Sequence, residues 1–410
     1  MRKFHLRKYC YLVLWLALFA AVAGVWLFGQ EPPPAVGQES AVPPAASPTA
    51  VVPQTEEEAL VGVWVPYFSL STPENTQEAF EANYLQIAQT AKEKGVNAMF
   101  VHVRPFSDAL YPSAAYPWSH ILTGTQGQDP GFDPLQFMID TTHDLGMEFH
   151  AWLNPLRVKT SETPVSLADN NPYTVLSPEY PQYFMKWDGG VYLNPAYPAV
   201  RSMIAQGAAE IAENYDVDGI HFDDYFYPSE DPSLDSAAYE SYTQSVENPL
   251  PLLEWRAANI NAMVAQVYES IKAVKEEVVF GISPQGNIAN DEAMGADVKT
   301  WAAVPGYVDY LAPQLYFSFE NEALGYLEAL EEWAALPRHK GLKLYAGLAL
   351  YKVGTDADGG TWLGRDDIIA LQAEAALAAG YQGAILYSSD YLDADQTAQS
   401  VEKAMAVFGK

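Results

Sequence analysis

The stretch that decides the fold is VDGIHFDDYFYP, residues 217–228. It is largely apolar up to Phe222 and then reaches two adjacent carboxylates, Asp223 and Asp224. An apolar run of this kind that follows a helical segment predicts a buried parallel strand. Because side chains alternate along a strand, His221 and Asp223 share one face, while Asp224 turns to the other face or begins the next loop. We therefore expect Asp223 at the mouth of whatever the strands enclose.

Seven further apolar segments resemble this strand, and a helical pattern follows each of the eight. Alternating β and α segments imply parallel strands with right-handed crossovers, and eight such units predict an α/β fold of the (β/α)8, or TIM, barrel type. No Gly-x-Gly-x-x-Gly motif follows the first strand, which argues against a dinucleotide-binding open sheet. Long loops rich in Tyr, Pro and Asn are expected after strands 2, 3 and 4. Beside the central strand, the strands are predicted at 61–67, 96–103, 147–153, 278–283, 308–317, 343–349 and 383–388.

The first 58 residues differ from the rest of the chain. Four Lys or Arg residues lie among the first eight, and an apolar run follows from residue 9 to 28, so residues 1–30 are predicted to be a signal anchor or a signal peptide. A run of about 20 residues suffices to span a bilayer, which favours an uncleaved membrane anchor over a secreted product. Residues 31–58 are rich in Pro and Ala and are expected to form a disordered linker, with one domain over 59–410.

The charge of the chain limits its partners. The formal net charge is −30, from 52 acidic and 22 basic residues. So acidic a surface argues against binding nucleic acid or anionic lipid head groups, and it fits a neutral ligand better than an anionic one. It is also what keeps many exported proteins soluble. The one cysteine, Cys10, lies in the apolar run, so the domain must be held by its core rather than by disulfides.

The predicted strand ends carry the candidate functional residues. Chemistry on a barrel of this type sits at the carboxyl ends of the strands and in the loops that follow. Here those ends combine amides, charged groups and flat aromatic rings, which can stack on pyranose faces and bind sugar hydroxyls. His102 and Arg104 occupy alternate positions and should share a face. We expect the substrate to contact Arg104, His150, Trp152, Asn154, Asn194, Gln314 and Tyr316.

Cleavage of a glycosidic bond requires two carboxyl groups, about 5 to 9.5 Å apart, on either side of that bond. Asp223, at the end of the central strand, is the leading candidate for the nucleophile or electrostatic partner. The acid could be Asp108, Asp224 or Glu320, each on a loop at the same end of the barrel. Two structural alternatives stay open, in which Asp223 forms an ion pair with Arg104 and Asp224 caps its loop.

Three histidines on consecutive strands raise a second chemistry. His102, His150 and His221 could hold zinc for a metal-dependent deacylase. Each lies inside its strand, about two residues before the end, where a hydrogen-bonded core histidine is the commoner outcome. We therefore assign no metal and no cofactor. A carbohydrate-binding barrel without turnover is the other alternative to a hydrolase.

Several long motifs resemble a known family. They are HVRPFSDALYPS at 102–113, YPWS at 116–119, GFDPL at 131–135, HAWLNP at 150–155, YLNP at 192–195, DGIHFDDY at 218–225 and APQLY at 312–316. Together they resemble the glycosyl hydrolase-like family 10, also called the DUF187 family. The resemblance implies exported or membrane-anchored bacterial proteins in which a TIM barrel acts on glycan, with peptidoglycan strands as the suspected substrate. The stretch at 218–225 is also similar to the strand-four signature of chitinase-like barrels, but Tyr225 stands where those enzymes place their acid glutamate.

Overall fold

The computed structural model describes residues 58–224 and 226–410. The predicted membrane segment, all but the last residue of the predicted linker, and Tyr225 lie outside the described residues. Within the described part, no helix is both long enough and apolar enough to cross a membrane.

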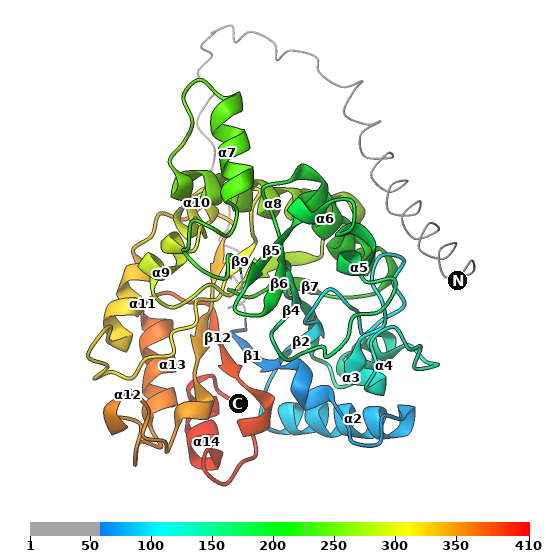
Figure 1. Ribbon diagram of the computed structural model, residues 1–410. Helices are drawn as coiled ribbons and strands as arrows, with labels where there is room; N and C mark the ends of the chain where they lie inside the picture. The colour runs from blue at the N-terminus through cyan, green and yellow to red at the C-terminus, as the bar shows by residue number, and fades with distance from the viewer. Residues whose placement is uncertain (1–57, 225) are drawn as a thin grey trace, which may run out of the picture.

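The core of the domain is a nearly closed barrel of parallel strands, consistent with the predicted TIM barrel (Figure 1). Each predicted strand position holds an observed strand, except that the seventh is divided by Tyr345 into two short strands. The first of these pairs with one end of the sheet and the second with the other, which brings the ends together. In the order of the sheet the strands are β10 (Lys343–Leu344), β9 (Tyr310–Leu311), β8 (Val279–Ile282), β7 (Gly219–Phe222), β3 (Glu148–Leu153), β2 (Ala98–Arg104), β1 (Leu60–Val65), β12 (Gly383–Tyr387) and β11 (Ala346–Leu348).

The alternation of side chains along the strands divides the core into two layers. Trp64, Phe100, Trp152 and Tyr310 belong to a compact cluster inside the barrel. Residues at the intervening positions, such as Val63 and the other outward-facing valines and leucines, belong to a larger cluster between strands and helices. The inner layer is aromatic because a small number of large rings is enough to fill the space inside a barrel of this width. The barrel is therefore a packed core with its chemistry confined to the ends.

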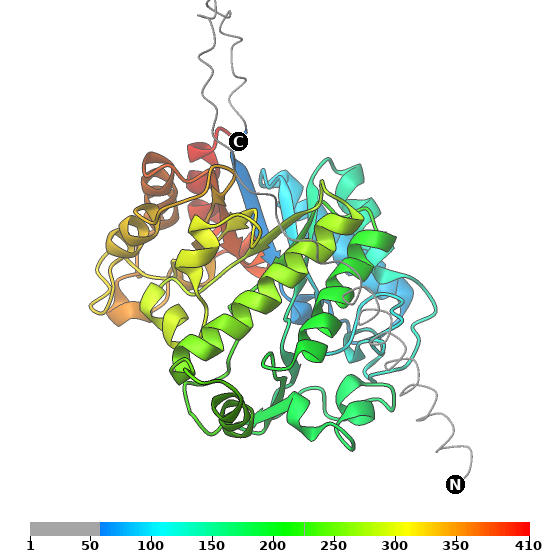
Figure 2. The same ribbon diagram turned by 90° about the horizontal axis from the view of Figure 1, so that it is seen from above.

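Helices surround the strands (Figure 1). Two of them begin at clear sequence signals, since the side chain of Thr76 accepts from the Ala79 N–H and that of Asp133 from the Gln136 N–H. The two longest helices on one side, α6 and α8, pack side by side (Figure 2). The main outer helices are α2 (Gln77–Glu93), α4 (Pro134–Asp144), α6 (Pro198–Asn214), α8 (Leu252–Val274), α11 (Tyr326–Ala334), α13 (Ile368–Ala378) and α14 (Ala398–Val407).

The segment after β3 was expected to be a loop but contains a small antiparallel sheet in the order β4 (Arg157–Lys159), β6 (Gly190–Leu193) and β5 (Phe184–Trp187). A two-residue turn, Asp188 and Gly189, joins β5 to β6 with φ values of 44° and 72°. Positive φ at both positions defines a type I′ turn, for which Asp-Gly is a favoured sequence. The loop prediction missed this hairpin because its strands are only four residues long.

The insertion after β7 is also folded. It carries α7 (Ser236–Ser245), and a buried ion pair between Arg256 of α8 and Asp235, 2.6 Å apart, fixes its base.

Candidate active site

Asp223 lies directly after β7 and is 3% exposed. Its Oδ2 atom accepts from the indole Nε1 of Trp152, at 3.1 Å, and from the amide Nδ2 of Asn154. Because β3 pairs with β7, with Trp152 opposite His221, the ends of the two strands are neighbours. An acceptor held by two N–H donors suits an ionised carboxylate, which has no proton to donate. The structure thus brings together three of the residues that the sequence selected.

Arg157 extends this group and was not among the predicted residues. Its Nη2 donates to Oδ1 of Asn154, and its Nε donates to the carbonyl oxygen of Pro105 at 2.9 Å. The guanidinium also lies over the ring of Phe106, 5.0 Å from the centroid. The signal that could have identified it is its place three residues after Asn154, as the first cation after the third strand.

Asp224 is held from the opposite side of the barrel end. The Nε2 atom of Gln314 donates to its Oδ1 at 3.1 Å and to the carbonyl oxygen of Ser283 at 3.0 Å. Burial raises the pKa of the Asp224 carboxyl, although the Gln314 bond and the charge of Arg157 oppose that shift. A raised pKa keeps the proton on this carboxyl to a higher pH, which is what a general acid requires.

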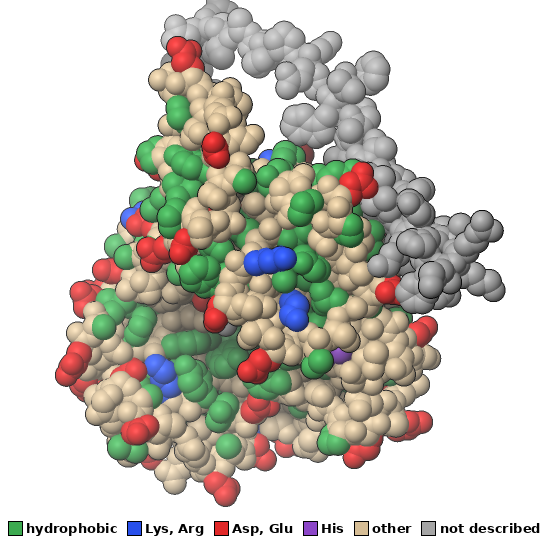
Figure 3. Space-filling view, viewed as in Figure 1, with side chains coloured by type: hydrophobic (Ala, Val, Ile, Leu, Met, Phe, Trp, Pro, Cys, Tyr) green, Lys and Arg blue, Asp and Glu red, His purple; other side chains and the backbone are tan. Residues whose placement is uncertain are grey.

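Tyr316 lies close enough to Asp223 and Asp224 for their charges to affect its hydroxyl group. Burial raises its pKa, and the charges of Asp224 and Asp223 add to the shift. Its ring packs at 6.0 Å from that of Tyr351 and 5.9 Å from that of Tyr387. Figure 3 shows this face of the molecule hollowed, with hydrophobic side chains gathered in the hollow and acidic ones at its edge. The arrangement combines aromatic rings with two carboxylates, as a sugar site needs.

Asp291 is a second residue that sequence reasoning missed. It lies on α9 (Ile288–Ala293), is 2% exposed, and accepts from the Gln285 N–H at 3.0 Å through Oδ1. Its Oδ2 has no hydrogen-bond partner within the described residues. Burial raises the pKa of this carboxyl well above its usual value, and the charge of Asp224 contributes. Nothing in the sequence distinguishes it from an ordinary acid in the first turn of a helix.

Arg104 does not face the mouth, so the expectation that it shares a face with His102 is wrong. A register shift between these two residues interrupts the alternation of β2. The guanidinium lies over the ring of Tyr116, 4.6 Å from its centroid, in the layer between the barrel and α6. The ion pair between Arg104 and Asp223 that the sequence left open is excluded for the same reason.

His150 points into the barrel but near its amino-terminal end. Its ring stacks on Phe100, and its Nε2 lies 3.2 Å from Glu148, the first residue of β3. It lines a cavity of about 900 Å³ on the side opposite the mouth, together with Asn97 and Lys343. The expectation that His150 contacts the substrate at the mouth is therefore wrong, because His150 lies too early in its strand.

The side chains of the other two histidines, His102 and His221, are buried inside the barrel. The indole N–H of Trp64 donates to Nε2 of His221 at 3.1 Å, and Nδ1 of His221 lies 2.9 Å from the Tyr310 hydroxyl. Burial lowers the pKa of His221 well below its usual value, so the ring is neutral. His102 stacks on Trp152, 3.8 Å between centroids. Within the described residues, no three His, Cys, Asp or Glu side chains are grouped as metal ligands.

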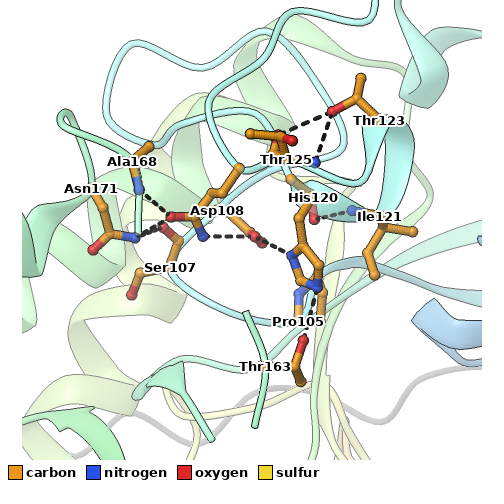
Figure 4. A network of polar contacts seen from close by, with 12 residues as sticks. Pro105, Ser107, Asp108, His120, Ile121, Thr123, Thr125, Thr163, Ala168 and Asn171 are labelled. Atoms are coloured by element: carbon orange, nitrogen blue, oxygen red, sulfur yellow. Dashed lines mark hydrogen bonds and ion pairs between the residues drawn. The ribbon is translucent and has the colours of Figure 1, made fainter. Parts of the chain in front are cut away.

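Asp108 is fully buried in a network that joins the loop after β2 to the segment after β3 (Figure 4). Its Oδ2 accepts from Nε2 of Gln126 at 2.9 Å and contacts Nδ1 of His120 at 3.3 Å. His120 in turn contacts the Thr163 hydroxyl, and Gln126 accepts from Asn171. Asp108 is thus placed to tie two long loops together.

Two further predicted residues make their contacts away from Asp223 and Asp224. Glu320 is exposed and pairs with Arg365 at 3.5 Å. Asn194 is buried, donates to the carbonyl oxygen of Gln182 and accepts from the Ala196 N–H, so it shapes the turn before α6. Of the four carboxylates selected from the sequence, Asp223 and Asp224 are the two that stand at the strand ends with other predicted site residues.

A barrel of this kind with two carboxylates after β7 carries the groups that cleavage of a glycosidic bond requires. The chain belongs to the family Glycosyl hydrolase-like 10, whose model matches residues 59–362. Glycosyl hydrolase YngK of Bacillus subtilis (strain 168) is 36% identical over 317 residues, and the match covers 72% of this chain and 59% of that relative. Glycosyl hydrolase DigH of Escherichia coli (strain K12) is 30% identical, with 96% of each chain covered.

Solved structures share the fold. The catalytic domain of the β-amylase from Paenibacillus polymyxa matches 85% of this chain and 98% of its own, with a TM-score of 0.57 and 13% identity. The PgaB (BpsB) glycoside hydrolase domain from Bordetella bronchiseptica matches 85% of this chain and 99% of its own, with a TM-score of 0.55 and 14% identity. At such identities the likeness concerns the fold alone.

Proposed function

We propose that the protein is a glycoside hydrolase in which Asp223 and Asp224 are the catalytic carboxyl pair. The observation that carries this proposal is the difference between their surroundings. Asp223 accepts two N–H bonds, whereas Asp224 has a pKa raised by burial. Two carboxyl groups whose environments favour opposite protonation states are the usual basis for dividing the roles of acid and base.

In this mechanism Asp224 donates its proton to the oxygen of the leaving sugar as the glycosidic bond breaks. The ionised Asp223 acts on the anomeric carbon, as nucleophile or as the electrostatic partner of the developing positive charge. A water molecule then forms the new bond to the anomeric carbon and returns a proton to Asp224, which restores both carboxyl groups. Trp152 and Asn154 hold the Asp223 carboxylate in place. Gln314 keeps Asp224 directed to the same end of the barrel.

We propose a bacterial cell-wall glycan, or another extracellular glycan, as the substrate. The aromatic side chains around Tyr316 suit the apolar faces of pyranose rings. Folded segments after β2, β3 and β7 stand at the mouth end of the barrel and could border an extended chain. The names of the relatives YngK and DigH support glycan hydrolysis in general.

We further propose that the domain works outside the cytoplasm, tethered by residues 1–30 and the linker. The apolar run with its basic flank supports this placement. Because β1 begins at Leu60, the linker joins the barrel at its amino-terminal end, opposite the mouth. A tether at that end leaves the mouth free to meet the glycan.

The test is to incubate the purified protein with cell-wall glycan strands, with and without their peptides, and to identify products by mass spectrometry. Shortened glycans from the natural protein, absent with Asp223→Asn, would support hydrolysis. Binding of the strands without any product would instead favour a carbohydrate-binding barrel.

A further inference from the structure

The small antiparallel sheet carries a pocket of its own, about 890 Å³ in volume. It lies between one face of β4, β5 and β6 and the short helix α5 (Pro172–Leu176). The side chains that matter for a ligand are Lys159, Lys186, Tyr173, Thr174 and Ser177.

The pairing of the strands places the two lysines on the same face. Lys159 of β4 and Lys186 of β5 are both directly opposite Val191 of the central strand β6. Residues opposite one another in an antiparallel sheet point to the same side, with Cβ atoms about 5 Å apart. The two ammonium groups therefore stand on either side of Val191, about 10 Å apart at their bases.

Neither lysine is neutralised. Among residues 58–224 and 226–410, no ion pair involves Lys159 or Lys186, although Lys94, Lys299 and Lys403 all pair with carboxylates. Figure 3 shows basic side chains over the small sheet, beside the hollow of the barrel. The chain has a net charge of −30, so a pocket with two lysines outside any ion pair differs from the acidic character of the rest of the protein. One acidic side chain, Asp188 of the hairpin turn, also borders the pocket.

An aromatic ring accompanies these charges. Tyr173 lines the same pocket, and Nζ of Lys186 lies 5.8 Å from the centroid of its ring. An aromatic ring can stack on a sugar face, and an ammonium group beside it can bind a carboxylate on that sugar. A neutral sugar would offer the two lysines only hydroxyl acceptors, whereas a carboxylate would also pair with their positive charge.

The same sheet also supports the candidate active site. A register shift between Arg157 and Lys159 interrupts the alternation of β4, and Arg157 is opposite Tyr192, the residue next to Val191. Arg157 therefore points to the other face of the sheet and reaches Asn154. The sheet that supports the candidate active site on one face thus carries the pocket on its other face.

We propose that the pocket over β4, β5 and β6 is a subsite for a sugar residue that carries a free carboxylate, at a distance from the bond that is cleaved. The inference rests on the proposed function for its orientation, since it takes the ligand to be part of the glycan substrate. Lys159 and Lys186 bind the carboxylate, and Tyr173 stacks on the ring. The overall acidity of the protein favours neutral ligands, but this pocket reverses that preference locally.

The experiment measures binding, so it does not depend on turnover. Asp223→Asn protein is titrated calorimetrically with hexuronic acid oligosaccharides, with N-acetylhexosamine oligosaccharides bearing lactyl carboxylates, and with the carboxyl-reduced form of each. We expect at least one charged ligand to bind about tenfold more tightly than its reduced form, with the difference shrinking at high salt. The double change Lys159→Gln and Lys186→Gln should abolish the difference. Lys403→Gln, on the outer helix α14, is the matched control and should preserve it.

Equal affinity for charged and reduced ligands in both series would overturn the proposal, as would a preference that survives the double substitution. The two hypotheses fail separately. If the protein hydrolyses no glycan but binds the charged ligand through the two lysines, the subsite proposal is supported and the proposed catalytic function is contradicted. If the natural protein hydrolyses glycan but its binding does not depend on the lysines, the catalytic function is supported and the subsite proposal is contradicted.

Discussion

The amide of Asn154 donates to the carboxylate of Asp223 and accepts from the guanidinium of Arg157. One side chain thus joins the end of β3, the carboxylate after β7 and the first strand of the small sheet. Because Arg157 also donates to the Pro105 carbonyl, the chain of contacts extends to the loop after β2. The position of Asp223 is therefore set by three segments of the chain, and each can be tested.

Asp223→Asn should reduce the rate of glycan hydrolysis by at least about 10²- to 10⁴-fold, the range over which a positioned catalytic group typically acts. Binding should persist because asparagine has nearly the same shape and still accepts from Trp152. Rates come from product release and affinities from calorimetry. Unchanged hydrolysis would remove Asp223 from the mechanism.

Arg157→Lys should lower kcat about tenfold and leave KM nearly unchanged. Lysine keeps the positive charge but cannot donate to Asn154 and Pro105 together, as the planar guanidinium does. Asn154, and with it Asp223, would then be held less firmly. A rise in KM at constant kcat would instead place Arg157 in direct contact with the substrate.

Gln314→Ala should move the alkaline limb of the pH profile of kcat/KM to higher pH. The bond from Gln314 lowers the pKa of Asp224, so its loss raises that pKa further. If Asp224 must be protonated to act, the enzyme then stays active to a higher pH. Gln136→Ala, on the exposed side of α4, is the control and should leave the limb in place. A limb that does not move in Gln314→Ala would mean that another group is the acid.

Asp108→Ala should destabilise the domain by about 1–3 kcal/mol, because it leaves the buried amide of Gln126 and the ring of His120 without an acceptor. We expect the folded variant to retain its kcat. Asp129→Ala, at an exposed site in the same loop, should change the free energy of unfolding by less than about 0.5 kcal/mol. Denaturant unfolding and steady-state rates check both. A large fall in kcat without loss of stability would return Asp108 to the catalytic candidates.

Prolonged dialysis against a chelator should leave glycan hydrolysis unchanged. The ring nitrogens of His221 already contact Trp64 and Tyr310, and in the described part of the chain no three His, Cys, Asp or Glu side chains are grouped as metal ligands. Loss of activity that zinc restores would revive the metal-dependent alternative.

The sequence by itself determined the order of strands and helices. Apolar runs that alternate with amphipathic helices are a local pattern, and only parallel pairing with right-handed crossovers satisfies eight of them in succession. The same local reasoning placed Asp223, Trp152 and Asn154 at the carboxyl ends of their strands, and all three meet in the structure. It also identified Asp224 and Gln314, which lie 90 residues apart and share a hydrogen bond.

Only the tertiary structure decided which polar residues reach the mouth. Alternation along a strand predicts which face a side chain is on but not how far along the barrel it lies, so the position of His150 was predicted wrongly. Alternation also breaks down at a register shift, which is why the position of Arg104 was predicted wrongly. Burial depends on the whole fold. The raised pKa of Asp291 and the hydrogen-bond network of Asp108 therefore could not be predicted from the sequence. The two lysines beside Val191 lie 27 residues apart, and strand pairing alone brings them into one pocket.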